Sequence, residues 1–420
     1  MIPNIISVAI VLAVLIVIHE FGHLVIAKAS KVPVEKFSIG FGPVLLKKKI
    51  KETVYQLSLI PFGGYIKMLG EESEVEGGFL LQPAPKKIGV VLAGPISNFI
   101  LGFILTFIML LTFGEKYVEP RISLTTDSWE AKSGLRNGDL ILTIESDTIT
   151  NFSDIENILL KHQAETLAIR VKRDDNVVSI PFWVAAESLT ISPFLLPIVG
   201  QVKRGGPAWR IGLRANDQIK AVAGQPITVW DEFVQLIRTS AGKKILIQWQ
   251  RENLLFTDSV IPELKTDELS GEKIGQIGVW VRLPKKSLSF PTAFLASAKR
   301  CLDVVIQTLV VIYKVITGQI SRRAIGGPIM VAKITYEGVD WGAEYFLALW
   351  AILSINLFVV NLIPVPVLDG GRILLFIIEV IRRKRLTKKQ LDFALNLGWG
   401  LIILLIFFTL FNDIVRIVRP

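Results

Sequence analysis

Long apolar stretches dominate the pattern of hydrophobic and polar positions along the chain. Residues 4–27, 88–113 and 344–363 are each long enough to cross a bilayer, which takes about 20 residues in a helix. Residues 394–411 form a shorter stretch that carries no charge. The pattern therefore predicts an α-helical multipass membrane protein with four transmembrane helices.

A fifth apolar stretch, residues 302–317, contains Asp303 and Lys314. Charged residues within an otherwise apolar helix are typical of helices that lie in the plane of the membrane surface. We therefore expect this segment to be an amphipathic helix at the interface. Counting it as a span would also place one of the two basic loops described next on the wrong side of the membrane.

The orientation follows from the positive charge between the spans. Residues 28–87 hold ten Lys and no Arg, and residues 382–389 read RRKRLTKK. Loops rich in Lys and Arg remain on the cytoplasmic side of a membrane. Both basic loops are therefore predicted to be cytoplasmic, and the N-terminus, the large middle region and the C-terminus are predicted to lie outside.

Composition agrees with this picture and narrows the functional classes. The chain of 420 residues is 51% hydrophobic, which favours a membrane protein with a soluble insert. Its net charge of +10 is a topology signal, and we expect no nucleic-acid partner. The single cysteine, Cys301, excludes an internal disulfide. The N-terminus lacks a basic region and a small-residue cleavage site, so we expect a retained first span.

The soluble insert, residues 115–280, contains an internal repeat. Residues 131–150 align with residues 209–228 at a fixed offset of 78, and each copy is followed by a short helical pattern, at 154–160 and 231–238. A turn, an alternating strand and a helix recur in the same order. The repeat therefore predicts two copies of one small α+β domain.

Each copy resembles a PDZ domain through its G-L-x-x-x-D-x-I pattern. Such domains bind peptide C-termini by adding a strand to a sheet edge. The first copy has Ser146 and Asp147 where a glycine is usual, and the second has Asn216 where the first has Gly138. Asn tolerates positive φ, so the fold is expected in both copies. Peptide binding and a role as a steric spacer both remain open for each copy.

Polar residues inside the first predicted span identify a candidate metal site. His19, Glu20 and His23 form H-E-x-x-H, which places both imidazoles on one face of a helix. A chance match is the alternative. Ionisable groups in an apolar helix cost several kcal/mol unless they are paired or ligated, so we favour zinc. Glu20 can then act as general base, whereas His162 is expected to be an ordinary surface residue.

A third zinc ligand must come from elsewhere in the membrane portion, and the best candidate is Asp369. It follows Pro364 and Pro366, which cannot continue a helix, so the chain is expected to unwind there. His19 lies about 24 Å along the first span at 1.5 Å per residue, near the side on which the third span ends. A helix cap or turn is the alternative role for Asp369.

These motifs together resemble the site-2 proteases, a family of intramembrane zinc metalloproteases. The matching segments are HEFGH (19–23), GFGP (40–43), QLSLIPFGGYIKMLGE (56–71), AGPISNF (93–99), the tandem PDZ insert, GGPIMVAK (326–333), NLIPVPVLDGG (361–371) and FND (411–413). The resemblance implies that His19, His23 and Asp369 hold one Zn²⁺ per chain and that Glu20 is the acid/base.

The resemblance also suggests how substrate is held. Residues 53–68 alternate in polarity and contain Pro-Phe-Gly-Gly, which fits a membrane-associated β-hairpin with Gly63 and Gly64 at its turn. A free strand edge can hold an unwound substrate by backbone hydrogen bonds. Asn361, in the stretch expected to unwind with Pro364 and Pro366, is a second candidate for binding the substrate backbone. A local turn or cap is its alternative role.

The expected architecture has five parts. They are the N-terminal membrane half (1–114), PDZ domain 1 (115–189), PDZ domain 2 (190–282), an interfacial linker (283–341) and the C-terminal membrane half (342–420).

The expected function is endoproteolysis of membrane-spanning segments near the cytoplasmic side of a bacterial inner membrane. The resemblance implies single-pass substrates, namely an anti-sigma factor already trimmed by a site-1 protease, and remnant signal peptides. An inert membrane-anchored PDZ scaffold with a structural zinc is the alternative. A metal transporter is disfavoured because the second and fourth spans offer almost no ionisable residues.

Overall fold

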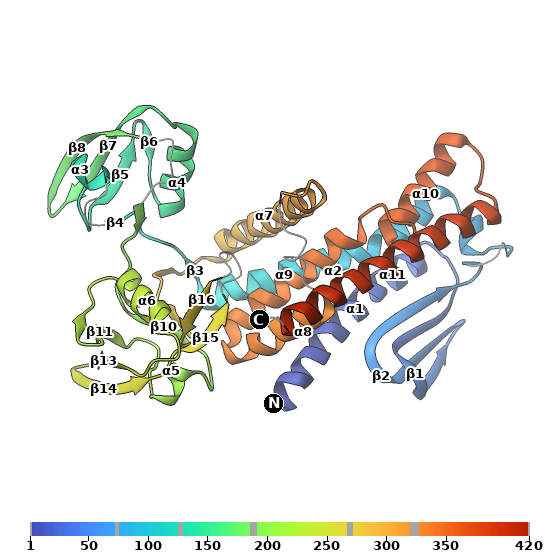
Figure 1. Ribbon diagram of the computed structural model, residues 1–420. Helices are drawn as coiled ribbons and strands as arrows, with labels where there is room; N and C mark the ends of the chain where they lie inside the picture. Colours follow the sequence, from blue (N-terminus) through green and yellow to red (C-terminus); the bar gives the residue numbers. More distant parts are fainter. Residues whose placement is uncertain are drawn as a thin grey trace. The chain divides into compact units, whose positions relative to one another are not determined.

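The computed structural model describes residues 2–71, 75–124, 129–184, 191–266, 272–319 and 327–418 (Figure 1). The chain divides into two compact units. One unit combines Met1–Thr112 with Leu288–Pro420, and the other is Phe113–Ser287. The second unit is thus an insertion in the sequence of the first.

The first unit is mainly helical. Its helices are α1 (Ile2–Ala29), α2 (Ala84–Phe113), α7 (Phe290–Ile316), α8 (Pro328–Asp340), α9 (Ala343–Asn361), α10 (Asp369–Arg382) and α11 (Lys388–Val418). Four of these helices, α1, α2, α9 and α11, are long and apolar enough to cross a membrane. They coincide with the four apolar stretches, so the prediction of four candidate spanning helices is confirmed.

The fifth apolar stretch is part of the longer helix α7. This helix packs along the apolar helices: Cys301 Sγ lies 3.8 Å from the Thr106 hydroxyl of α2, and the Thr308 hydroxyl donates to Asn356 of α9 at 2.7 Å. It does not meet the criteria for a spanning helix. Its position relative to the membrane surface remains a prediction.

The β-structure between α1 and α2 differs from the expected hairpin. Strands β1 (Val34–Ile50) and β2 (Thr53–Met68) pair with each other, and the tight turn joins Ile50 to Thr53. Phe37 pairs with Ile66 on one side and with Tyr55 on the other, so the start of β1 lies between two parts of β2. The prediction of a hairpin within residues 53–68 was therefore wrong. Pro-Phe-Gly-Gly forms a bend at which β2 passes from one side of β1 to the other.

The second unit contains two halves with the same strand order. The first half has β5 (Leu140–Ile144), β6 (Asp147–Thr148), α4 (Phe152–Lys161), β7 (Thr166–Arg173) and β8 (Asn176–Trp183), in the sheet order β6-β5-β7-β8. The second half has β11 (Gln218–Val222), β12 (Gln225–Pro226), α6 (Trp230–Thr239), β13 (Ile245–Arg251) and β14 (Leu254–Val260), in the order β12-β11-β13-β14. The internal repeat in the sequence thus corresponds to two sheets with the same order of strands.

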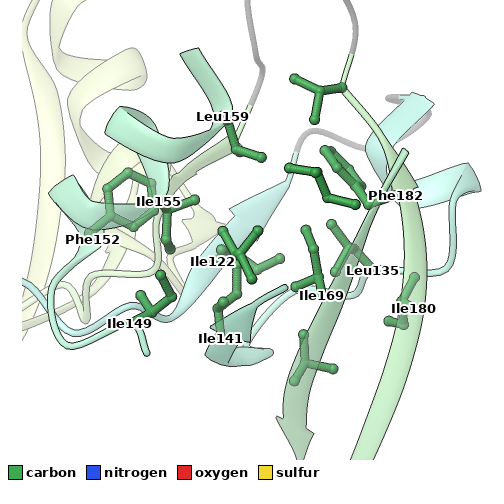
Figure 2. Close-up of a cluster of buried hydrophobic side chains, with 14 of the residues drawn as sticks. Ile122, Leu135, Ile141, Ile149, Phe152, Ile155, Leu159, Ile169, Ile180 and Phe182 are labelled. Atoms are coloured by element: carbon green, nitrogen blue, oxygen red, sulfur yellow. The ribbon is translucent and has the colours of Figure 1, made fainter. Parts of the chain in front are cut away.

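Shorter elements complete this unit. They are β3 (Glu115–Lys116), β4 (Ile122–Leu124), α3 (Trp129–Lys132), β9 (Ile191–Pro193), β10 (Val199–Val202), α5 (Pro207–Arg210), β15 (Glu263–Thr266), β16 (Lys273–Gln276), β17 (Val279–Val281) and β18 (Lys285–Lys286). Strand β4 pairs with β9 in the first half, and β10 pairs with β17 in the second. The separate apolar core of the first half is shown in Figure 2.

Matching polar contacts recur in the two halves. Asp139 accepts two hydrogen bonds from the Arg173 guanidinium, and Asp217 accepts two from Arg251. Both aspartates are buried, so each needs this partner to offset the cost of leaving water. Asn216 adopts a φ of 73°, which shows that asparagine fills the left-handed position predicted for it.

Candidate metal centre

Two imidazoles project from one face of α1. His19 and His23 are one helical turn apart, both are buried, and their Nε2 atoms lie 3.2 Å from each other. The helix is continuous from Ile2 to Ala29, so the i, i+4 spacing alone brings the two rings together. The pair therefore presents two nitrogen atoms at one point.

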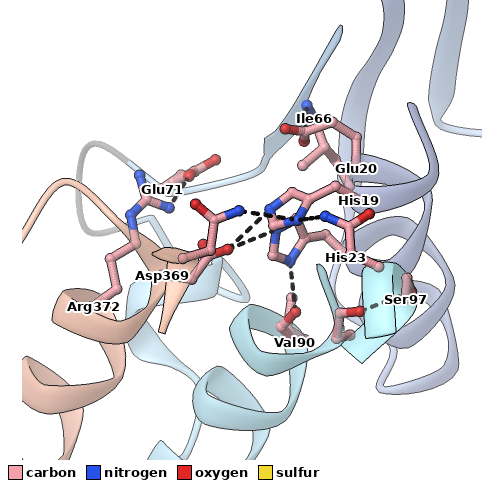
Figure 3. A network of polar contacts seen from close by, with 12 residues as sticks. His19, Glu20, His23, Ile66, Glu71, Val90, Ser97, Asp369 and Arg372 are labelled. Atoms are coloured by element: carbon pink, nitrogen blue, oxygen red, sulfur yellow. Dashed lines mark hydrogen bonds and ion pairs between the residues drawn. The ribbon is translucent and has the colours of Figure 1, made fainter. Parts of the chain in front are cut away.

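Asp369 reaches the same point from the other end of the sequence (Figure 3). Its Oδ2 atom lies 3.0 Å from His19 Nε2 and 3.6 Å from His23 Nε2. It is the first residue of α10, after the irregular stretch that contains Pro364 and Pro366. Burial would raise the pKa of Asp369, but its contacts with His19 and His23 hold that pKa below its usual range.

The three donor atoms fit a zinc ion. Two nitrogens and one carboxylate oxygen are a donor set that zinc commonly takes, and their separations are 3.0, 3.2 and 3.6 Å. Ligands about 2.0–2.1 Å from a tetrahedral ion lie about 3.3 Å apart. Among the described residues, His19, His23 and Asp369 form the one group of three or more potential ligands close enough to share an ion.

Second contacts orient each imidazole. The Nδ1 atom of His23 lies 2.8 Å from the carbonyl oxygen of Val90, so Nδ1 carries a proton and Nε2 is left with a lone pair. The Nδ1 atom of His19 instead faces two side-chain amides, at 3.1 Å from Asn98 and 3.4 Å from Asn361. Asn361 was predicted to lie in the unwound stretch, but it is the last residue of α9, and the irregular stretch begins one residue later.

Gly94 of α2 allows the two rings to lie against the neighbouring helix. A Cβ at this position would overlap with His23 and would approach His19 Nε2 to 2.8 Å. A Cβ on Gly22 of α1 would likewise overlap with the backbone carbonyl of Ala93. In the sequence, close packing of helices explains a glycine at position 94 as well as a role at the site does. The contact of Gly94 with both imidazoles was therefore not predicted.

We expect Gly94→Ala to lower the zinc affinity by at least about tenfold, because the added methyl group displaces both imidazole rings. Competition with a chromogenic chelator measures this. Gly89→Ala is the matched control, since the same methyl group on the same helix would meet no atom within 4 Å. Equal zinc affinity in both variants would contradict the contact described here.

Glu20 lies beside the three potential ligands and is bonded to the sheet. The backbone N–H of Ile66 donates to Glu20 Oε2 at 3.1 Å. The carboxylate lines a cavity of about 260 Å³ together with His19, His23 and Asp369. Because water occupies about 30 Å³ per molecule, this space is large enough for several waters. Glu20 can therefore exchange a proton with a molecule at the three-ligand point.

The edge of β2 that faces α1 is already engaged by side chains. Besides the bond to Glu20, the N–H of Met68 donates to Glu71 at 3.2 Å. Gly63 sits at the bend with a φ of 115° and packs against Phe41, and a Cβ on Gly64 would lie 3.7 Å from Glu20. A substrate strand on this edge would therefore compete with Glu20 and Glu71 for two N–H groups.

An ion pair that the sequence did not reveal connects this sheet to the helix of Asp369. Arg372 donates to Glu71 Oε1 at 2.7 Å, and both residues line the cavity. Removal from water would lower the pKa of Arg372, but the neighbouring Glu71 carboxylate raises it. The one feature of the sequence that could have indicated this ion pair is the basic residue one turn after Asp369. The pair connects the first turn of α10 to the segment that follows β2.

Comparison with known proteins agrees with this geometry. The model of peptidase family M50 matches residues 7–405. The regulator of sigma-E protease RseP of Salmonella typhimurium is 30% identical over 447 residues, covering 99% of this chain and 99% of that protein. RseP of Escherichia coli K12 is 30% identical over 448 residues, covering 98% of each. A Neisseria meningitidis protein whose name contains the words zinc metalloprotease is 30% identical, covering 96% of this chain and 97% of its own length.

Among solved structures, the PDZ domain of an SdrC-like protein of Listeria innocua is similar to part of the chain. It is 26% identical, with a TM-score of 0.18, and the match covers 21% of this chain and 93% of that domain. The family match and the full-length relatives concern the whole chain. The chain therefore belongs to peptidase family M50 and is a metalloprotease.

Proposed function

We propose that this protein is an intramembrane zinc endopeptidase that cuts membrane-spanning segments of single-pass proteins. One observation carries the proposal: two imidazoles from an apolar helix and a carboxylate from a distant segment converge to within 3.6 Å, beside a glutamate that is not one of the three. A structural zinc site would instead need a fourth protein ligand. Among the residues that the structure describes, the group of close donor atoms has three members, which leaves a fourth position for water or substrate.

His19 Nε2, His23 Nε2 and Asp369 Oδ2 are the atoms that would hold one zinc ion per chain. A zinc ion held there supplies Lewis acidity, which lowers the pKa of water and polarises the scissile carbonyl. Glu20, oriented by the Ile66 N–H, takes a proton from the attacking water at its carboxylate and delivers it to the leaving amine nitrogen. The cavity wall positions the substrate backbone against these groups.

The proposed setting is a bacterial inner membrane crossed by α1, α2, α9 and α11. Its termini and the PDZ unit lie outside, and the metal centre lies near the cytoplasmic side. The two basic loops support this topology because they meet in space. Arg385 donates to the Leu81 carbonyl at 3.1 Å, and Lys87, at the end of the first loop, pairs at 2.6 Å with Glu379 in the last part of α10, just before the second loop. Both loops therefore belong at one face of the membrane.

The proposed substrates follow from the relatives named as regulators of sigma-E. They are a membrane anti-sigma factor left by a site-1 protease, and remnant signal peptides. We assign residues 115–189 and 190–282 to two PDZ domains that exclude uncut substrates by size and have grooves suited to peptide C-termini. Residues 283–341 form the proposed interfacial linker between this unit and the last two spanning helices.

Substrate holding is assigned to the residues around the cavity. A spanning helix must be unwound before hydrolysis, because its carbonyls are already hydrogen-bonded. Asn361 lines the cavity and can bond an extended backbone. Pro364 and Pro366 interrupt the helix between Asn361 and Asp369, so both side chains can face His19. Gly63 and Gly64 form the bend that brings the edge strand against Glu20.

Removal of the metal tests the function directly. We expect the purified protein in lipid vesicles to cleave a single-pass substrate that lacks its outer domain, to stop after treatment with 1,10-phenanthroline, and to recover when Zn²⁺ is added. Mass spectrometry of the products should place the cut within the spanning segment. Cleavage that survives chelation, or a cut confined to residues outside the membrane, would contradict the proposal.

A further inference from the structure

Asn98 places a primary amide at a fully buried position of the apolar helix α2. Its side chain is 0% exposed, and its Nδ2 atom lies 3.1 Å from His19 Nδ1. An amide removed from water costs free energy unless it is hydrogen-bonded. An apolar residue would fit the surrounding helix better, so the amide at this position calls for a specific partner.

The chemistry of His19 supplies that partner. Its Nε2 faces Asp369 and His23, so metal binding would use this atom. A histidine that binds metal through Nε2 carries its proton on Nδ1, and the resulting N–H requires an acceptor. His23 has such an acceptor in the Val90 carbonyl. For His19, the described bonds at Nδ1 run to the amides of Asn98 and Asn361.

Asn98 is the better acceptor of the two. It is closer than Asn361, at 3.1 against 3.4 Å, and its Oδ1 atom is buried without a hydrogen-bond partner among the described residues. Nothing therefore holds the amide against a half-turn, which exchanges Oδ1 and Nδ2. In either orientation one of the two amide atoms, Oδ1 or Nδ2, lacks a hydrogen-bond partner. The contact with His19 therefore determines which orientation is more stable. An N–H at Nδ1 is repelled by the Nδ2 donor and bonded by Oδ1.

We propose that Asn98 is a positioning residue whose amide oxygen accepts the Nδ1–H of His19 and thereby keeps Nε2 free to bind the metal. The hydroxyl of Ser354 on α9 donates to the Asn98 backbone carbonyl at 2.7 Å, so Ser354 contacts the backbone at this position and not the side-chain amide. This inference rests on the proposed zinc centre. It is tested by metal affinity and spectroscopy without peptide cleavage, so its failure and that of the proposed protease function are distinguishable.

The first test is zinc affinity, measured by chelator competition on the full chain. We expect Asn98→Leu to lower the affinity about 10- to 100-fold, as loss of an outer partner of a ligating histidine does. Asn98→Asp should bind at least as tightly as the wild type, because a carboxylate is a stronger acceptor. Ser354→Ala, which removes only the backbone contact, should match the wild type. Wild-type affinity in Asn98→Leu, or equal weakness in Asn98→Asp, would overturn the proposal.

The second test is the ¹⁵N spectrum of the zinc-loaded protein with labelled histidine. The chain has three histidines, and His162→Gln identifies the signal outside the site. We expect the Nδ1–H proton of His19 to resonate far downfield and exchange slowly, and to lose both properties in Asn98→Leu. Should Asn98→Leu not fold, the wild type decides alone. Zinc bound through Nδ1, or a freely exchanging Nδ1–H, overturns the proposal.

Discussion

We expect Glu20→Gln to bind zinc as the wild type does but to cleave a reconstituted single-pass substrate about 10²- to 10⁴-fold more slowly. Glutamine keeps the size of the side chain and an oxygen that can accept the Ile66 N–H. It cannot accept a proton at neutral pH. Initial rates in lipid vesicles, with zinc content determined on the same samples, separate the loss of chemistry from the loss of metal.

The matched control for this variant is Glu35→Gln. Glu35 lies on the same sheet and makes a surface ion pair with Lys67 at 3.6 Å, away from the metal centre. The same chemical change there should leave cleavage and zinc content unaltered. Full turnover by Glu20→Gln would show that Glu20 is not the acid/base, whereas a scaffold with an inert metal site would cleave in neither form.

The second large effect is expected at Asp369. Asp369→Ala should lose zinc affinity by more than about 100-fold, since the loss of an outer partner alone costs about 10- to 100-fold. Cleavage should fall with zinc occupancy. Asp369 is the first residue of α10, and Leu368 occupies the N-cap position, so the Asp369 carboxylate is not the helix cap. It contacts His19 and His23 instead.

A serine at the same position distinguishes the ligand role from a turn role. Serine keeps a small polar side chain at the first position of α10 but is a poor zinc ligand, so Asp369→Ser should fold with wild-type helix content and still lose the metal. Thermal unfolding followed by circular dichroism, together with zinc content, provides the two readouts. Retained zinc in Asp369→Ser would show that the third ligand lies elsewhere.

The parts of the molecule that the sequence predicted are those determined by short-range rules. Four apolar helices follow from the length of apolar runs, and the His19–His23 pair follows from helical periodicity. The repeat in the inserted unit is visible because residues 131–150 recur as residues 209–228 at one fixed offset. Each of these features appears as a pattern within one short segment of the chain, or as a second copy of such a pattern.

The features that sequence reasoning missed depend on distant contacts. The bend of β2 around β1 is determined by pairing across the sheet, which alternating polarity does not specify. Gly94 was ambiguous because a glycine in a helix serves packing and close approach to a side chain equally well. Arg372 and Glu71 are 301 residues apart, so nothing local indicates their ion pair.

Zinc K-edge absorption of the purified protein in lipid, combined with anomalous diffraction, measures the central feature of this account. We predict one zinc per chain, bonded to Nε2 of His19, Nε2 of His23 and the carboxylate of Asp369, with Glu20 unbonded and no fourth protein ligand. Zinc bonded to a fourth residue, or located away from these three side chains, would contradict a catalytic metal centre built from α1 and the start of α10.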